Sequence, residues 1–265
     1  MRRVLRPYLL APLLTTGIAA AAWGQGAATA HAAPTSGAAA STRAAPAARD
    51  GPRAHLETAS EPGTRVLRVG MRGTDVRALQ HRLAAWHYFP GRFDGYFGPF
   101  TQEAVWAFQE VQHLTVTGQV GSTTRKALAH PRPPRALVPG GGRLRVEISL
   151  SRRTLVLYRS GRVALISHVS TGGGYRYCTS SGCARAITPT GNFRTTAYLP
   201  GWINVELGRM FNSVFFIGTK YAIHGEWYVP LRPVSHGCVR IPMDIAGFFH
   251  KLVRTPGTPV YIRSS

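Results

Sequence analysis

The chain has 265 residues, enough for one or two compact units with real cores, and its 44% hydrophobic and 10% aromatic content excludes a wholly disordered protein. It carries 32 basic and 11 acidic residues, and the resulting net charge of +21 favours anionic partners. The basic residues are nearly all dispersed arginines and form no readable nucleic-acid motif, so we expect no nucleic-acid partner.

The first 32 residues have the pattern of an export signal. The first six contain three arginines, residues 9–23 are uncharged but too few to span a bilayer comfortably, and Ala30-His31-Ala32 has the small residues that a signal peptidase needs. An uncleaved anchor is the alternative. Residues 33–64, rich in Ala and Pro, predict a disordered tether. We therefore expect a secreted, extracytoplasmic protein with no permanent membrane anchor.

Residues 65–130 predict a small unit of three helices. Apolar residues recur at helical spacing in three stretches, which Gly-rich and Pro-rich turns separate. The expected N-caps are Thr74, Thr101 and Ser122. A unit of this length is near the lower limit for independent stability.

This unit resembles the peptidoglycan-binding type 1 domain. The resemblance rests on Leu67-Arg68-Val69-Gly70, Asp94-Gly95-Tyr96-Phe97-Gly98, Phe108-Gln109 and Thr117-Gly118, among other matches that span the whole unit. An unrelated helical bundle, whose Gly and Asp residues only make turns, is the alternative. The resemblance implies peptidoglycan as a partner and leaves open whether the unit binds glycan or acts as a spacer.

Residues 131–142 combine a Pro-rich stretch with three glycines, which predicts a linker that isolates the helical unit from the domain that follows. Apolar residues alternate with a period of two at 144–150 and again at 163–169, and a β-rich run at 155–158 lies between them, as in a β-meander. A helix is expected only within 241–253, before a last strand at 259–262. The expected fold is therefore α+β multidomain, with a mostly β domain at 143–265.

Cys238 and His224 are the candidate reactive pair. A thiolate is a nucleophile, and a nearby imidazole accepts its proton, so the pair predicts acyl transfer. Gly237 permits a tight turn, so the amides of Gly237 and Cys238 are expected to point at an oxyanion. A zinc site built from His224, His236 and Cys238 is the rival, but it lacks an evident fourth ligand. We expect neither a metal nor another cofactor.

Residues 143–263 resemble the L,D-transpeptidase (YkuD) family. The matching segments are His224-Gly225, Ser235-His236-Gly237-Cys238-Val239-Arg240, Ser170-Thr171-Gly172 and 188–193. The resemblance implies a β-sandwich-like fold in which Cys238 is the nucleophile, His224 is the base, and a backbone carbonyl near Gly225 orients the base. Glu226 is an outside candidate for that orienting role. Ten residues separate His224 from Ser235, fewer than in many relatives, so the flap over the substrate is expected to be small.

The other candidate site residues each have two interpretations. His236 either stabilises the site or packs beneath the Cys238 loop. Arg240 either binds a substrate carboxylate or braces that loop. Trp227 and Tyr221 either wall the substrate groove or belong to the core. Ser235 is also a groove candidate, but we expect it to make a structural hydrogen bond.

Three cysteines in an exported chain leave one odd thiol. Cys178 and Cys183 flank a short loop and are the expected disulfide, which would hold residues 172–188 beside the groove and leaves Cys238 free. Two further free thiols are the alternative.

The resemblance as a whole implies a cell-wall-associated L,D-transpeptidase that cross-links peptidoglycan through a cysteine thioester. An L,D-carboxypeptidase with water as acceptor and a non-catalytic peptidoglycan-binding protein are the alternatives. The expected partners are peptidoglycan stem peptides and glycan, together with anionic wall polymers, and we expect a monomer.

Overall fold

The computed structural model describes residues 65–265, which all belong to one compact unit. The expected export signal and tether lie outside the described residues. Within 65–265, no helix is long and apolar enough to cross a membrane.

The helical unit contains three helices, as expected. They are α1 (Thr74–Ala85), α2 (Pro99–Val111) and α3 (Ser122–Ala129). The expected N-caps are wrong, because a glycine precedes each helix at the cap position and no side chain there makes a capping hydrogen bond. Thr101 lies inside α2, where its hydroxyl donates to the Pro90 carbonyl. The Thr101 hydroxyl therefore bonds to a buried carbonyl group instead of capping the helix.

The C-terminal domain is mostly β, with eleven strands and one helix in residues 143–265. The strands are β1 (Arg145–Ser149), β2 (Thr154–Arg159), β3 (Arg162–His168), β4 (Arg176–Thr179), β5 (Gly182–Arg185), β6 (Gly191–Arg194), β7 (Tyr198–Val205), β8 (Gly208–Ile217), β9 (Tyr221–Glu226), β10 (Val239–Pro242) and β11 (Pro259–Arg263). The helix α4 (Met243–Leu252) falls within the expected range. The predicted fold class is confirmed.

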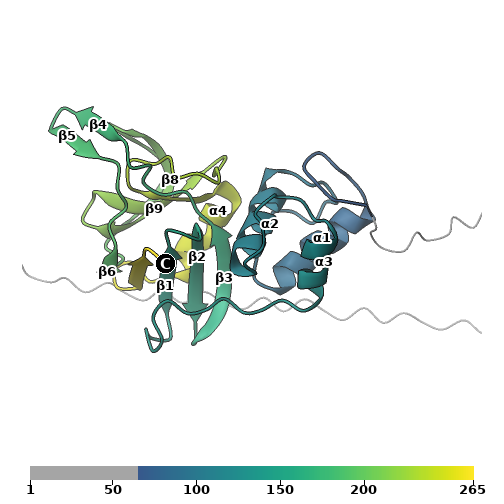
Figure 1. The fold of residues 1–265 in the computed structure, drawn as a ribbon. Coiled ribbons are helices and arrows are strands. Elements are labelled where there is room, and N and C mark those ends of the chain that lie inside the picture. The colour runs from purple at the N-terminus through teal and green to yellow at the C-terminus, as the bar shows by residue number, and fades with distance from the viewer. Residues whose placement is uncertain (1–64) are drawn as a thin grey trace, which may run out of the picture. The chain divides into compact units, whose positions relative to one another are not determined.

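Two larger sheets and α4 enclose the core of this domain (Figure 1). One sheet has the order β3-β2-β1-β11-β6 and the other β10-β9-β8-β7, while β4 and β5 form a separate hairpin. Alternate residues of facing strands, such as Ile148, Leu157 and Ile223, meet in one cluster with Phe249 of α4. The residues between them on each strand therefore point away from this core.

The outer face of β2 and β3 is buried against the helical unit. Val156 and Ile166 belong to the same hydrophobic cluster as Val105 and Phe108 of α2, and Figure 1 shows α2 next to β3. The Ile166 amide also donates to the carbonyl of His87, at 2.8 Å. The expectation that the linker isolates the helical unit is wrong, because the two parts share a core.

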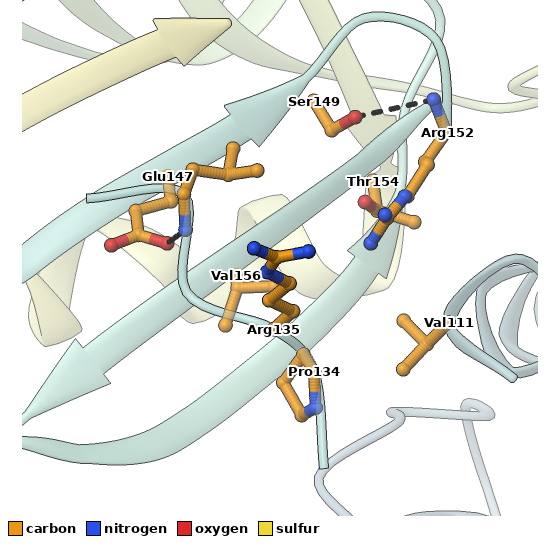
Figure 2. A pocket seen from close by; sticks show the side chains of 9 residues that line it. Val111, Pro134, Arg135, Glu147, Ser149, Arg152, Thr154 and Val156 are labelled. Carbon is orange, nitrogen blue, oxygen red and sulfur yellow. Dashed lines mark hydrogen bonds between the residues drawn. The ribbon is translucent and has the colours of Figure 1, made fainter. Parts of the chain in front are cut away.

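The linker itself lies against the sheet. Figure 2 shows Pro134 and Arg135 passing between Val111 of α2 and Val156 of the sheet, around a cavity of about 10 Å³. The Leu137 amide donates to the buried carboxylate of Glu147 at 2.7 Å. A Pro-rich composition predicts a stiff segment, and a stiff segment can still pack against a neighbouring surface.

Candidate active site

Cys238 and His224 lie on one face of the second sheet. Cys238 immediately precedes β10, which pairs with β9 so that Arg240 stands opposite His224. Alternation along a strand places Cys238 and Arg240 on the same side. The intervening Val239 and its partner Ile223 point into the core, so His224, Cys238 and Arg240 face outward. All three line one pocket.

Ser235 and Thr188 hold the loop that carries Cys238. The Ser235 hydroxyl donates to the Cys238 carbonyl at 2.5 Å and accepts the Gly237 amide at 3.0 Å. The Thr188 hydroxyl donates to the Gly237 carbonyl at 2.7 Å. The Gly237 amide is therefore occupied by Ser235, which differs from the expectation that it points at an oxyanion. Ser235 has the structural hydrogen bond that the sequence favoured.

Gly237 is the residue that this tight loop requires. Its φ of +137° lies in the region that side chains disfavour. A Cβ atom there would lie 2.6 Å from a ring carbon of Tyr221 and 2.9 Å from the carbonyl oxygen of Ile187. A side chain at this position would therefore collide with Tyr221 and Ile187 and strain the loop that carries Cys238.

His224 is buried, and a backbone carbonyl fixes its ring. Its Nδ1 lies 3.1 Å from the Gly225 carbonyl oxygen. Because that oxygen can only accept, Nδ1 carries the proton and the Nε2 lone pair is free to accept another. Burial and, to a smaller extent, Arg240 lower the pKa of His224 to about 4, although the hydrogen bond to Gly225 acts in the opposite direction. The imidazole is thus a neutral base at physiological pH. Glu226 does not take the orienting role, since its carboxylate accepts the Trp227 amide instead.

Cys238 is a neutral thiol for the same physical reason. Burial raises the pKa of its thiol, and this outweighs the opposing effects of an Ala222 backbone hydrogen bond and of Arg240. Its Sγ lies 4.0 Å from both Met210 Sδ and the Lys220 carbonyl oxygen. At neutral pH the pocket therefore holds a neutral thiol and a neutral imidazole, not a thiolate and an imidazolium.

The pocket around these residues has a volume of about 460 Å³. The hairpin β4–β5 lines it from one side and the turn between β7 and β8 from another. The Ser180 amide in the first turn donates to the Glu206 carboxylate in the second, at 2.5 Å. Arg209, Lys220 and Arg240 make the lining basic. The pocket therefore suits an anionic substrate.

The structure places most of the predicted groove residues in this pocket. Tyr221, Ser235, His236 and Arg240 all line it. His236 also packs edge-on against Tyr175 and Tyr177, with ring centroids 5.4 and 4.8 Å away. Buried Arg240 Nε has no hydrogen-bond partner among residues 65–265.

Trp227 is the groove prediction that is wrong. Its side chain is 64% exposed and it does not line the pocket. The residue follows the end of β9, where the chain leaves the sheet toward the helical unit. The whole segment between Glu226 and Ser235 is absent from the pocket lining, so the expected flap covers nothing there.

The expected disulfide is confirmed, and it closes the β4–β5 hairpin, which lies beside the groove as predicted for residues 172–188. Cys178 and Cys183 are joined by a disulfide and stand opposite one another on the two strands. Tyr177, Thr179 and Ala184 of this hairpin line the pocket. The signal in the sequence was the cysteine pair, because a bridge over so short a loop stiffens an exposed hairpin.

Within residues 65–265, no group of three or more His, Cys, Asp and Glu side chains is arranged to hold a metal ion.

Family models match both parts of the chain. The peptidoglycan binding domain matches residues 72–128, and the L,D-transpeptidase catalytic domain, YkuD, matches residues 143–262. The first match is the helical unit and the second contains the pocket with Cys238.

Relatives of known name agree with these matches. The crystal structure of an L,D-transpeptidase from Xylanimonas cellulosilytica is 34% identical, with a TM-score of 0.70, and the match covers 77% of this chain and 100% of that one. An N-acetylmuramoyl-L-alanine amidase, CwlL, from Bacillus licheniformis is 41% identical over 64 residues, or 22% of this chain and 18% of the amidase. A carboxy-terminal processing protease, CtpB, from Bacillus subtilis is 39% identical over 62 residues, or 23% of this chain and 13% of the protease. The chain thus spans less than a fifth of these two proteins. By its match to the Xylanimonas enzyme, the chain belongs to the L,D-transpeptidase (YkuD) family, with a peptidoglycan binding domain in front of the catalytic domain.

Proposed function

We propose that this protein is a secreted cell-wall enzyme that cross-links peptidoglycan stem peptides through a thioester on Cys238. The observation that carries the proposal is the pairing of a free thiol with a buried, neutral imidazole in one basic pocket. His224 Nε2 takes the thiol proton as Sγ attacks the carbonyl carbon of the donor peptide bond. The C–N bond then breaks, and His224 returns the proton to the leaving amine.

In the second half of the reaction, an amine of a second stem peptide attacks the thioester. His224 removes the proton from that amine, the new C–N bond forms, and the C–S bond breaks to regenerate the thiol. Water in place of the amine gives a carboxypeptidase by the same steps. The Gly225 carbonyl keeps His224 in the tautomer that both steps require.

Arg240 and Tyr221 have supporting roles in this proposal. The Arg240 guanidinium, at the pocket wall, suits a carboxylate of the donor stem. Tyr221 lines the same pocket as Cys238, and its ring lies against Gly237, the neighbour of Cys238 in the chain. We assign the Tyr221 hydroxyl as a donor to the developing oxyanion, since the Gly237 amide is occupied.

Intact-protein mass spectrometry after exposure to a carbapenem tests the nucleophile. We expect one adduct, on Cys238, and none on the Cys238→Ala variant, which removes the nucleophile but little volume. An adduct of unchanged stoichiometry on that variant would end the thiol mechanism. A tetrapeptide donor, assayed with and without an amine acceptor, then separates cross-linking from hydrolysis by the product formed.

We also propose that the helical unit contacts peptidoglycan at a second pocket, of about 750 Å³, which it forms together with Asp244 of α4. The rings of Phe89, Phe93 and Phe100 line it, as do the carboxylates of Asp94 and Asp244. Aromatic faces and hydrogen-bonding carboxylates together suit the two surfaces of a sugar ring.

Phe93→Ala tests this site, because its side chain is 41% exposed and its loss should leave the fold intact. We expect weaker sedimentation with insoluble peptidoglycan. Trp86→Ala, another exposed aromatic on the same unit (38%), is the matched control outside the pocket. Equal losses for the two variants would argue against this pocket.

A further inference from the structure

The segment 227–234 connects the catalytic histidine to the cysteine loop, and the helical unit holds it. The Val229 amide donates to Glu103 Oε1 of α2 at 2.7 Å, although the two residues are 126 positions apart. Both side chains are completely buried. A residue of the peptidoglycan binding domain thus makes a direct hydrogen bond to the backbone between His224 and Cys238.

Further contacts fix the same segment from both sides. The ring of Tyr228 lies edge-on to Trp106 of α2, with centroids 6.3 Å apart. The carbonyl of Pro230 accepts from His168 Nε2 at 3.2 Å, and Trp106 in turn packs on that imidazole. On the far side, the Ser170 hydroxyl donates to the Arg232 carbonyl at 2.9 Å. Each contact acts on the backbone of the segment or on a ring beside it.

One face of α2 makes these contacts. Glu103, Trp106 and Glu110 are spaced i, i+3 and i+7, so they project on the same side of the helix. The first two touch the segment or its support. Glu110 instead pairs with Arg153, at the start of β2 and away from the segment. Glu110 therefore contributes to the same interface without touching the catalytic loop.

A buried carboxyl group here costs stability, because only part of its lost hydration is replaced. Glu103 Oε2 has no hydrogen-bond partner within the described part of the chain, and an apolar residue of similar size would avoid that cost. Burial raises the pKa of Glu103 to about 8, so at neutral pH the group is mainly a neutral carboxyl whose Oε1 accepts the Val229 amide. A hydrophobic side chain at position 103 would have no acceptor for the Val229 amide.

We propose that the peptidoglycan binding domain positions the catalytic pair, with Glu103 as the positioning residue that fixes the segment 227–234. The inference rests on the proposed roles of Cys238 and His224. The segment is short and joins the end of β9 to the Cys238 loop, so a shift of its backbone is transmitted to the separation between thiol and imidazole. A misplacement of about 1 Å in a reacting pair can cost 10²-fold in rate.

The test compares four variants in the full chain: Glu103→Ala, Glu103→Gln, Glu110→Ala and Glu110→Gln. The measured quantities are the first-order rate constant of Cys238 acylation at saturating carbapenem and the concentration that gives half of it. We expect Glu103→Ala to lose about 10-fold or more in the rate constant. Glu103→Gln, which keeps a carbonyl acceptor for Val229, should retain the rate constant within about 3-fold, since it preserves the hydrogen bond.

The two Glu110 variants measure the effect of weakening the interface between α2 and the catalytic domain without changing a contact to the segment 227–234. They should lower the melting temperature but leave the acylation rate constant unchanged. If Glu103→Ala and Glu110→Ala reduce the rate constant equally, or if Glu103→Ala acylates as the unsubstituted protein does, the positioning role is wrong. Failure of Glu103→Gln to restore the rate would also overturn it.

Hydrogen exchange provides a second measurement that does not depend on catalysis. The peptide containing 227–234 should exchange faster in Glu103→Ala than in Glu110→Ala. If Glu103→Ala does not fold, Tyr228→Ala replaces it, because this side chain is 52% exposed and its removal spares the core. Unchanged exchange and acylation in that variant would overturn the proposal. Absence of any adduct on the unsubstituted protein would instead count against the proposed function, and the exchange result would still decide whether Glu103 fixes the segment.

Discussion

Two buried histidines, His224 in the pocket and His168 at the helical interface, have similarly lowered pKa values but different neighbours. Burial lowers the pKa of each to about 4. His224 donates a hydrogen bond from Nδ1 to the Gly225 carbonyl, and it lines the pocket together with Cys238. His168 uses Nε2 for the Pro230 carbonyl, and its Nδ1 is buried without a partner among residues 65–265.

A lowered histidine pKa in this protein therefore reports burial of the ring and does not by itself indicate a catalytic role. Both imidazoles are neutral at physiological pH and are capable bases. His224 borders a cavity of about 460 Å³ that a substrate can enter, whereas the ring of Trp106 lies against His168. Access to a reacting group therefore separates the proposed base from the proposed support.

Substituting each histidine should give the largest contrast. His224→Ala should lower the acylation rate constant of Cys238 by about 10² to 10⁴, the usual contribution of a general base. His168→Gln, which keeps a donor for the Pro230 carbonyl, should change it by no more than about 3-fold. Stopped-flow or quenched mass spectrometry measures both. Similar losses in two folded variants would remove the distinction between the histidines.

The pH dependence of thiol alkylation tests whether the resting pair is neutral. Because burial raises the thiol pKa above its ordinary value, the thiolate fraction should rise about 10-fold per pH unit between pH 6 and 8. Iodoacetamide labelling of Cys238 should follow that slope. A rate that is flat over this range would indicate a thiolate paired with an imidazolium, and would contradict the neutral pair.

Acid stability should reveal both histidines, since each binds a proton more weakly in the folded chain than in the unfolded one. Their contribution is present above the unfolded pKa of about 6.5 and is lost as the pH falls toward the folded value of about 4. We expect a loss on the order of 3 kcal/mol per imidazole at most. The fall in melting temperature from pH 7 to 5 should be smaller in His168→Gln. An equal fall would show that His168 does not titrate in this range.

The disulfide hairpin should have the smallest effect, because neighbours of Cys178 and Cys183 line the pocket but neither cysteine does, and the bridge holds no reacting group. Replacing both with serine should lower hairpin stability by about 2 kcal/mol. We expect a few-fold higher carbapenem concentration for half-maximal acylation and an unchanged maximal rate constant. Thiol titration of the denatured, unreduced protein should find one free thiol, and three would contradict the bridge.

The sequence determined the elements and much of the candidate site. Strict alternation after Leu144 predicted the meander, and helical spacing predicted three helices, because these periods follow from backbone geometry alone. The resemblance around His224 and Cys238 predicted the proposed nucleophile, base and orienting carbonyl. All three lie on or directly beside the paired strands β9 and β10. Gly237 illustrates the limit of such reasoning, since its amide has a partner, Ser235, that only the folded loop brings within reach.

Only the tertiary structure decided how the two parts of the chain meet. In the structure β2 is buried on both faces and α2 is buried almost all round, but nothing in either segment identifies the surface that covers it. The hydrogen bond from Val229 to Glu103 spans 126 residues and leaves no local signature in either segment. Periodicity tells which face of an element is buried, whereas the surface that buries it depends on contacts between residues far apart in the chain, which no local pattern encodes.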